Sequence, residues 1–266
     1  MQAFVELVEE LSGGHPALVG ADQQGQVLGH ETGLDSLDAD PLQGGGEARQ
    51  FRVVVELGAM GEAAERWEGH GYTDYSYHPI FTGGADNTSI RQIGELVEAG
   101  FPSFKIFTTS IRPPSPQMQN NKTDFGRLSL IMEQVSEAGG MLLVHSEDDD
   151  MVHYNYDNAE EQGNVDWWQM HQIHTKLSED VSFRRVIRLA EQKNCPVYFV
   201  HVSASEGVEA VGEARSRGQA IYGETLHNYA CFSAENYREE NGMKYHTYPS
   251  LKSEDDRKTL WSGLLD

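Results

Sequence analysis

The sequence predicts an α/β protein built on a parallel sheet, and three observations support this prediction. Short apolar segments rich in β-branched and aromatic residues alternate with segments whose apolar residues recur at helical spacing. Most of the strand-like segments are continuously apolar, as in strands that are buried on both faces. Neither glycine-rich phosphate-binding fingerprint, GxGxxG or GxxxxGK[ST], occurs in the chain. Together these features favour a (β/α)₈-type barrel over a doubly wound nucleotide-binding sheet.

Six segments have the composition of strands, whereas a closed barrel of this type has eight strands. The second alternates polar and aromatic residues, whereas "MLLVH" and "VYFVH" are apolar runs closed by a histidine. Because helical segments lie between the strands, the strands should run parallel, with right-handed crossovers. The strands are expected at residues 51–59, 72–81, 103–109, 141–148, 195–204 and 219–227.

The predicted helices have apolar residues at helical spacing and begin or end at recognisable capping residues. The first ends at Gly100, and the second begins at Asp124 and stops at Gly139. The last has Ser253 as its N-cap and Asp256 three positions later, in the manner of a capping box. The helices are expected at residues 88–100, 124–140, 178–193, 205–218 and 253–266.

The chain divides into an N-terminal segment, residues 1–50, and a barrel domain, residues 51–266. The first segment is rich in glycine and acidic residues and includes a triple glycine at residues 44–46. Such a composition buries little apolar surface, so we expect loop or disorder in residues 1–50.

The charge balance excludes two classes of partner. The net charge is −22, whereas nucleic acids and anionic membranes require a basic protein surface. No apolar run approaches the roughly 20 residues of a membrane span, and no basic-then-apolar leader opens the sequence. Cys195 and Cys231 have no metal-type spacing and are interpreted as reduced thiols, so we expect a cytoplasmic protein. Simple solubility and a salt-rich cytoplasm explain the acidic charge equally well.

Three polar residues lie within or at the ends of successive predicted strands. Lys105 lies in "SFKIFTT", His145 closes "MLLVH", and His201 closes "VYFVH". Each alone has an ordinary structural explanation, since a strand lysine usually reaches solvent and a histidine usually bonds within a rim. In a parallel barrel, however, the carboxyl ends of the strands form the active-site face, and neutral imidazoles are good zinc ligands. The three residues together therefore indicate a metal site.

The same segments carry a resemblance to a known family. The text "SFKIFTT … LLVHSEDDDMV … PVYFVHVSASEGVEAVGEARSRGQAIYGETLHNY … KYHTYPSLKSEDDRKTLW" resembles the dihydropyrimidinase/hydantoinase branch of the amidohydrolase superfamily. The resemblance covers roughly residues 51–266. It implies a partial TIM-type barrel in which the six predicted strands are numbers 2 to 7.

The resemblance also implies the chemistry. It makes Lys105 the lysine that carries a carbamate on its side-chain nitrogen and bridges two divalent metals, usually zinc. His145 and His201 match the two histidines that bind one of these metals. The implied reaction opens dihydropyrimidine or hydantoin rings to N-carbamoyl amino acids, with two metals activating a shared hydroxide near neutral pH. The family forms homotetramers or dimers, so a homo-oligomer is expected.

The chain departs from the family pattern at the metal ligands. The family's first pair, an HxH at the end of strand 1, occurs nowhere in this sequence. The aspartate that follows strand 8, a metal ligand and general base, has no counterpart before the sequence stops. A truncated or misassembled gene product explains these gaps better than deliberate remodelling. Such a chain would form an incomplete barrel, and its activity is a separate hypothesis.

The expected substrate contacts also differ from the common hydantoinase pattern. The family usually has a tyrosine five residues after the metal lysine, where this chain has Ser110. Tyr248 stands where a serine usually bonds the substrate ring, and His227 and Asn228 follow strand 7 near the same face. These changes indicate a distinct subfamily. His171 and His174, which share a helical face, are expected outside the site, on the surface.

Two alternatives stay open at this point. A dihydroorotase or allantoinase would act on related cyclic amides, with donors for an acidic substrate that the sequence does not identify. A non-catalytic scaffold would keep the fold and lose the metals, as some family members have. The retained lysine and histidines argue against the scaffold, and the missing HxH pair argues for it.

Overall fold

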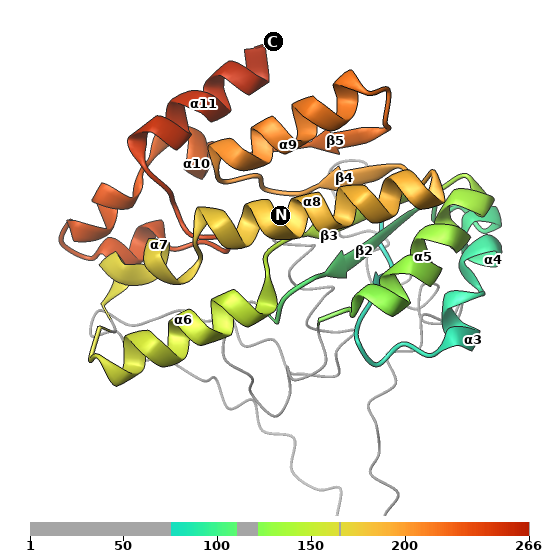
Figure 1. Ribbon diagram of the computed structural model, residues 1–266, viewed down its shortest axis with the longest axis horizontal. Coiled ribbons are helices and arrows are strands. Elements are labelled where there is room, and N and C mark those ends of the chain that lie inside the picture. The colour runs from blue at the N-terminus through green and yellow to red at the C-terminus, as the bar shows by residue number, and fades with distance from the viewer. Residues whose placement is uncertain (1–75, 111–121, 165, 266) are drawn as a thin grey trace, which may run out of the picture. The chain divides into compact units, whose positions relative to one another are not determined.

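The computed structural model describes residues 76–110, 122–164 and 166–265. Within them five strands form one parallel sheet in the order of the chain, β1-β2-β3-β4-β5 (Figure 1). The strand predicted at residues 51–59 and the segment 1–50 lie outside the described residues, so both stay predictions. The strands are β1 (Ile80–Phe81), β2 (Ser103–Phe107), β3 (Met141–His145), β4 (Val197–Phe199) and β5 (Ile221–Gly223).

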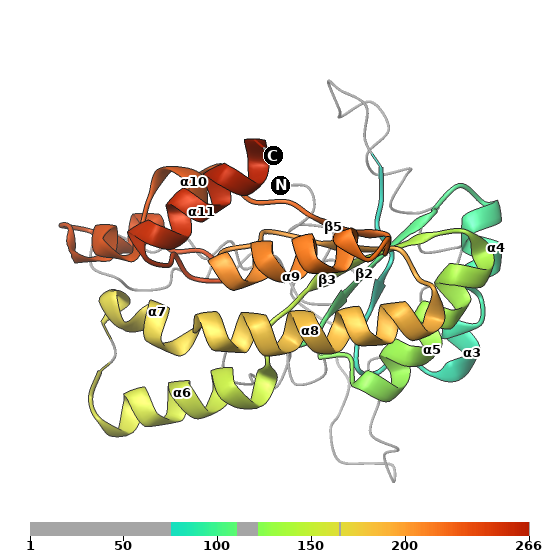
Figure 2. The same ribbon diagram turned by 45° about the horizontal axis from the view of Figure 1, so that its top comes forward.

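Helices follow the strands, as the alternating pattern predicts. In Figure 2 the helices α5, α8 and α9 lie along the same side of the sheet. No helix within the described ranges is long and apolar enough to cross a membrane. The helices are α3 (Asn87–Ile90), α4 (Ile93–Glu98), α5 (Phe125–Ala138), α6 (Asp149–Glu161), α7 (Met170–Ile173), α8 (Lys176–Lys193), α9 (Ser205–Ser216), α10 (His227–Cys231) and α11 (Glu254–Leu265), with 3₁₀ turns at Trp167–Gln169, Ala234–Arg238 and Gly242–Tyr245.

The two faces of the sheet have different characters. Alternate residues of β2, β3 and β4, such as Phe104, Val144 and Phe199, are fully buried and form the core with the helices. Phe199, for example, stacks on Phe183 of α8, with ring centroids 3.9 Å apart. The register pairs Lys105 with Leu143, and Leu143 with Tyr198, on the opposite face. Lys105 therefore points away from the helical core layer.

Several helix ends are fixed by the capping residues that the sequence predicts. The Asp124 side chain accepts a hydrogen bond from the backbone of Arg127, and Gly139 ends α5 in the left-handed conformation with φ of 72°. The helix predicted at residues 88–100 is instead divided into α3 and α4. At the break, the amide of Gln92 bonds the carbonyl of Ser89, a tighter turn than an α-helix makes.

The acidic run after β3 begins a helix, α6, that is not among the helices expected from the sequence. Asp148 caps α6 by accepting from the backbone amide of Met151 at 3.1 Å, and Asp149 and Asp150 occupy the first turn. Negative charges there face the positive end of the helix dipole and the free amides of the first turn. The run is therefore part of a helix start, which shortens β3 to five residues.

Candidate metal-binding site at the carboxyl edge of the sheet

Lys105 lies inside the protein at the carboxyl half of β2. Its side chain is 1% exposed, and its Nζ atom lies 4.8 Å from the ring centroid of Phe107. Burial lowers the pKa of the Lys105 amine from 10.5 to about 7, although the nearby Glu224 carboxylate acts in the opposite direction. An amine with this pKa is neutral in about half of the molecules at pH 7, and the neutral form is nucleophilic.

His145 and His201 face each other at the ends of β3 and β4. The Nδ1 atom of His145 lies 2.9 Å from the Nε2 atom of His201, and the ring centroids are 4.6 Å apart. Burial lowers the pKa of both imidazoles, so both are neutral at pH 7. His201 has a φ of 47°, a left-handed backbone that is uncommon for residues other than glycine and that belongs to functional turns. The edge thus gathers two neutral nitrogen donors.

A buried carboxylate, Glu147, stands behind His145. Its Oε2 atom accepts from His145 Nε2 at 3.0 Å, and its Oε1 atom accepts from His174 Nδ1 at 2.9 Å. Burial alone would raise the pKa of Glu147, but the two histidines hold it well below its usual value. The carboxylate therefore stays ionised and orients both imidazoles.

The expectation for His174 was wrong. The residue is fully buried rather than on the surface, and its Nε2 atom accepts a hydrogen bond from the hydroxyl of Tyr156 at 3.0 Å. Its helical spacing with His171 is real, but both belong to α7 and its C-cap, a short helix that packs against α6. His171 is half-buried and bonds the carbonyl of Trp168.

Two more polar residues lie on the face of the sheet that carries Lys105, and sequence reasoning did not identify them. His78, just before β1, bonds Ser103 through its Nδ1 atom at 2.7 Å, and burial together with the Lys105 charge lowers its pKa. Glu224, just after β5, accepts a hydrogen bond from Tyr198 at 2.9 Å. Glu224 lies within the strand predicted at residues 219–227, and a polar residue inside a predicted strand, like Lys105, was the signal that could have identified it.

The four predicted substrate contacts lie in different surroundings. Ser110 is buried, and its amide donates to Asp149 Oδ1 at 2.8 Å. The Tyr248 ring lies 5.1 Å from the ring of His174, which connects it to the histidine cluster. His227 and Asn228 begin α10 after β5, and His227 is exposed. Their roles as substrate contacts stay predictions.

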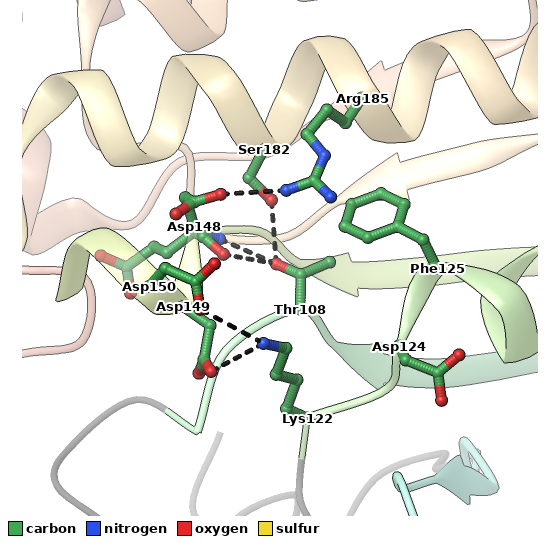
Figure 3. A pocket seen from close by; sticks show the side chains of 10 residues that line it. Thr108, Lys122, Asp124, Phe125, Asp148, Asp149, Asp150, Ser182 and Arg185 are labelled. Carbon is green, nitrogen blue, oxygen red and sulfur yellow. Dashed lines mark hydrogen bonds and ion pairs between the residues drawn. The ribbon is translucent and has the colours of Figure 1, made fainter. Parts of the chain in front are cut away.

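A cavity of about 240 Å³ lies beside the residues that follow β2 and β3 (Figure 3). Its charged groups are paired: Lys122 lies 2.8 Å from Asp149, and Arg185 lies 3.0 Å from Asp148. Thr108 bonds Ser182 at 2.9 Å across the cavity wall. This arrangement joins the connections after the strands to α6 and α8 and leaves little charge free for a ligand.

The edge gathers nitrogen groups of kinds that occur in metal sites. The facing nitrogens of His145 and His201 are imidazole donors of the kind found in zinc sites, and the buried Lys105 amine lies on the neighbouring strand. Among the described residues, however, no group of three or more histidine, cysteine, aspartate or glutamate side chains has a geometry that could hold a metal ion. Two facing imidazoles are fewer than the three or four protein ligands that zinc sites use.

The fold and this edge define a class of protein: an α/β chain whose five parallel strands match part of the TIM barrel of hydantoinases. A solved D-hydantoinase superposes with a TM-score of 0.68 at 27% identity, covering 77% of this chain and 44% of the other. The dihydropyrimidinase from Brevibacillus agri NCHU1002 gives a TM-score of 0.69 at 25% identity over the same shares of the two chains.

The sequence comparison names the same branch. The D-hydantoinase of Streptomyces coelicolor is 29% identical over 212 residues, which cover 77% of this chain and 44% of that protein. No protein-family model matches the sequence. The chain is thus partially homologous to the D-hydantoinases and dihydropyrimidinases of the amidohydrolase superfamily, and it spans less than half the length of these relatives.

Proposed function

We propose that this chain carries half of a metal-dependent cyclic amidase centre and takes part in opening hydantoin or dihydropyrimidine rings to N-carbamoyl amino acids. The observation that supports this most strongly is Lys105, buried at the strand edge beside the facing histidines. Burial disfavours the charged ammonium, so it lowers the pKa of the Lys105 amine and favours the neutral, nucleophilic form. The names of the relatives, D-hydantoinase and dihydropyrimidinase, point to the same ring-opening reaction.

Lys105 is suited to become a carbamate. Its neutral amine attacks carbon dioxide, a carbon–nitrogen bond forms, and the nitrogen releases one proton. The resulting carbamate is an anion with two oxygen donors. With a pKa of about 7, the amine is neutral in about half of the molecules at neutral pH, whereas an exposed lysine is almost entirely protonated.

The other residues have binding and orienting roles. His145 and His201 would bind one divalent metal through Nδ1 and Nε2, and the Lys105 carbamate would bridge to a second. When bound, such metals polarise the ring carbonyl and lower the pKa of a water molecule to near 7. Tyr248 would line the substrate side through its contact with His174. The chain would form a homo-oligomer, as the resemblance to the family implies.

One observation favours a second function, a non-catalytic scaffold. The sequence has no HxH pair, and the described residues contain no third histidine or acidic ligand placed to hold a metal. A site with two histidine ligands binds zinc weakly, because structural and catalytic zinc sites use three or four protein ligands. A dihydroorotase- or allantoinase-type cyclic amidase is separated from the first proposal by its substrates.

The deciding experiment measures metal content and carbamate together. Protein purified with Zn²⁺ and bicarbonate is analysed for zinc per folded chain, for oligomeric state, and for hydrolysis of hydantoin and dihydrouracil. We expect bound zinc in the wild-type chain and loss of most of it in Lys105→Ala, with folding unchanged by circular dichroism. A wild-type zinc content near zero would favour the scaffold.

A further inference from the structure

A continuous chain of hydrogen bonds runs from helix α6 to the facing histidines. Tyr156 bonds His174, His174 bonds Glu147, Glu147 bonds His145, and His145 bonds His201, over contacts of 2.9 to 3.0 Å. The side chains of His174 and Glu147 are fully buried, and that of His145 is 2% exposed. The chain joins residues far apart in sequence and excludes water from its middle.

The carboxylate at the centre fixes the direction of the two bonds made to it and, with neutral imidazoles, of the bonds beyond them. An ionised carboxylate accepts and cannot donate, so His145 presents its proton on Nε2 and His174 presents its proton on Nδ1. His174 Nε2 must then accept from the Tyr156 hydroxyl. His145 Nδ1 must carry a lone pair, and it points at His201. One side chain thus sets the tautomer of two imidazoles.

We propose that Glu147 and His174 are positioning residues, which hold His145 in the tautomer and orientation that present its Nδ1 lone pair to a divalent metal. This inference rests on the proposed metal centre and extends it from the ligands to the residues behind them. A ligand histidine whose other nitrogen donates to a carboxylate is better oriented and more basic, and loss of such a partner typically weakens metal binding 10- to 100-fold.

The positioning residues are themselves held by separate parts of the fold. The amide of Glu147 donates to the Thr108 hydroxyl at 3.0 Å, and that hydroxyl donates to the Glu147 carbonyl at 2.8 Å. The His174 carbonyl accepts from Ser250 at 3.3 Å. The rings of Tyr156 and Tyr248 lie edge-on against the His174 ring, with centroids 5.5 and 5.1 Å away. This chain of hydrogen bonds is therefore held in place by the residue after β2, by α6 and by the segment before α11.

The first test measures Zn²⁺ affinity by competition with a chromophoric chelator in bicarbonate buffer. Glu147→Leu removes the acceptor at similar size, and we expect Zn²⁺ binding to weaken 10- to 100-fold. In Glu147→Gln one amide oxygen serves only one imidazole, so its affinity should fall between those of the wild type and the leucine variant. Unchanged affinity in a folded Glu147→Leu protein would overturn the proposal.

A matched pair of histidine variants separates positioning from general damage to α7. His174→Phe removes the second donor to Glu147, and we expect weaker Zn²⁺ binding by up to about tenfold, since Glu147 then loses part of its orientation. His171→Phe makes the same substitution on the same helix, away from Glu147, and should leave Zn²⁺ affinity unchanged. Equal losses in the two variants would contradict the proposal.

A spectroscopic measurement on the wild-type protein tests the inference even if the variants do not fold or the protein binds no metal. Long-range ¹H–¹⁵N spectra of histidine-labelled wild-type protein, with His145 assigned through His145→Asn, report the tautomer without metal. We expect the proton of His145 on Nε2. A proton on Nδ1 would overturn the positioning role. Absence of Zn²⁺ binding in a wild-type protein that shows the expected tautomer would instead contradict the proposed metal centre alone.

Discussion

At the scale of single residues, the carboxyl edge of the sheet holds groups whose pKa values are shifted by burial and by their partners. Burial lowers the pKa of Lys105 to about 7, whereas Glu147 stays ionised because two imidazoles surround it. In both cases desolvation disfavours the charged form, and only Glu147 has partners that outweigh it. Burial also lowers the pKa of His145 and His201, so the two facing imidazoles are neutral and do not repel each other.

Lys105→Met should stabilise the chain in the absence of metal and bicarbonate. The folded-state pKa of Lys105, about 7, lies below its unfolded value near 10.4, so protonation favours the unfolded state between these pH values. The cost of the lysine is absent at high pH, grows as the pH falls from 10.4, and is complete at about pH 7. The methionine variant should therefore gain on the order of 4 kcal/mol at pH 7.

Urea unfolding of both proteins at pH 7, 8.5 and 10 measures this gain, and Lys252→Met provides a second buried lysine for comparison. The gain for Lys105→Met should shrink steadily toward pH 10. A gain that is the same at all three pH values would show that the lysine is not neutralised by burial.

Sequence reasoning placed some of these residues and missed others for a physical reason. Lys105, His145 and His201 were identified because each lies within or at the end of an apolar segment, which the local sequence alone predicts to be a strand. Glu147 lies two residues after His145, so its nearness was also readable. His174 was not, since its partner Glu147 is 27 residues away and only the packing of α7 brings the two together.

At the scale of elements, the ends of the predicted helices were more accurate than the ends of the predicted strands. Helix ends such as Asp124 and Gly139 are set by local hydrogen bonds and backbone conformation, which the sequence contains. Strand ends are set by the neighbouring strand, and the paired part of β4 is only Val197–Phe199 within the predicted residues 195–204. Polar residues just beyond the pairing, such as His201, belong to the candidate site, so the errors in strand length lie at this edge of the sheet.

Two glycines of α9 should respond oppositely to alanine. A Cβ atom at Gly207 would lie 2.7 Å from both Glu179 Oε1 and Val202 Cγ1, whereas one at Gly212 would meet nothing within 4 Å. Gly212→Ala should stabilise the protein by about 0.5–1 kcal/mol through helix propensity. Gly207→Ala should destabilise it by roughly 1–3 kcal/mol, because a fully packed junction must move.

Both substitutions replace glycine by alanine in the same helix, so each variant is a control for the other when unfolding in urea is measured. Glu179 is buried and bonds the amides of Ser203 and Ala204, which leaves it little freedom to retreat. A neutral or stabilising Gly207→Ala would mean that the start of α9 is looser than this packing indicates.

At the scale of the whole chain, electrostatic repulsion is the dominant long-range force. The 42 acidic residues exceed the 20 basic ones by 22, an excess that ion pairs such as Lys122 with Asp149 cannot remove. A large net charge disfavours the compact state through self-repulsion. The composition predicted this property directly, whereas it contained no information on which acids would be buried at the site.

Salt should therefore stabilise the protein at pH 7.5. Raising NaCl from 0.05 to 1 M shortens the screening length from roughly 14 Å to about 3 Å and should raise the melting temperature by about 2–4 °C. The same titration near the isoelectric point should give a much smaller rise, because the excess negative charge is gone. A melting temperature that falls with salt at pH 7.5 would show that ion pairs outweigh repulsion.

The strand order has a consequence for how the chain acquires its shape. The five described strands pair only with strands that are consecutive in the sequence. Among these five, no pairing therefore waits for a strand further along the polypeptide, and the loops to be closed stay short relative to the chain. Such a sheet can grow by one unit at a time, in the direction in which the ribosome delivers it.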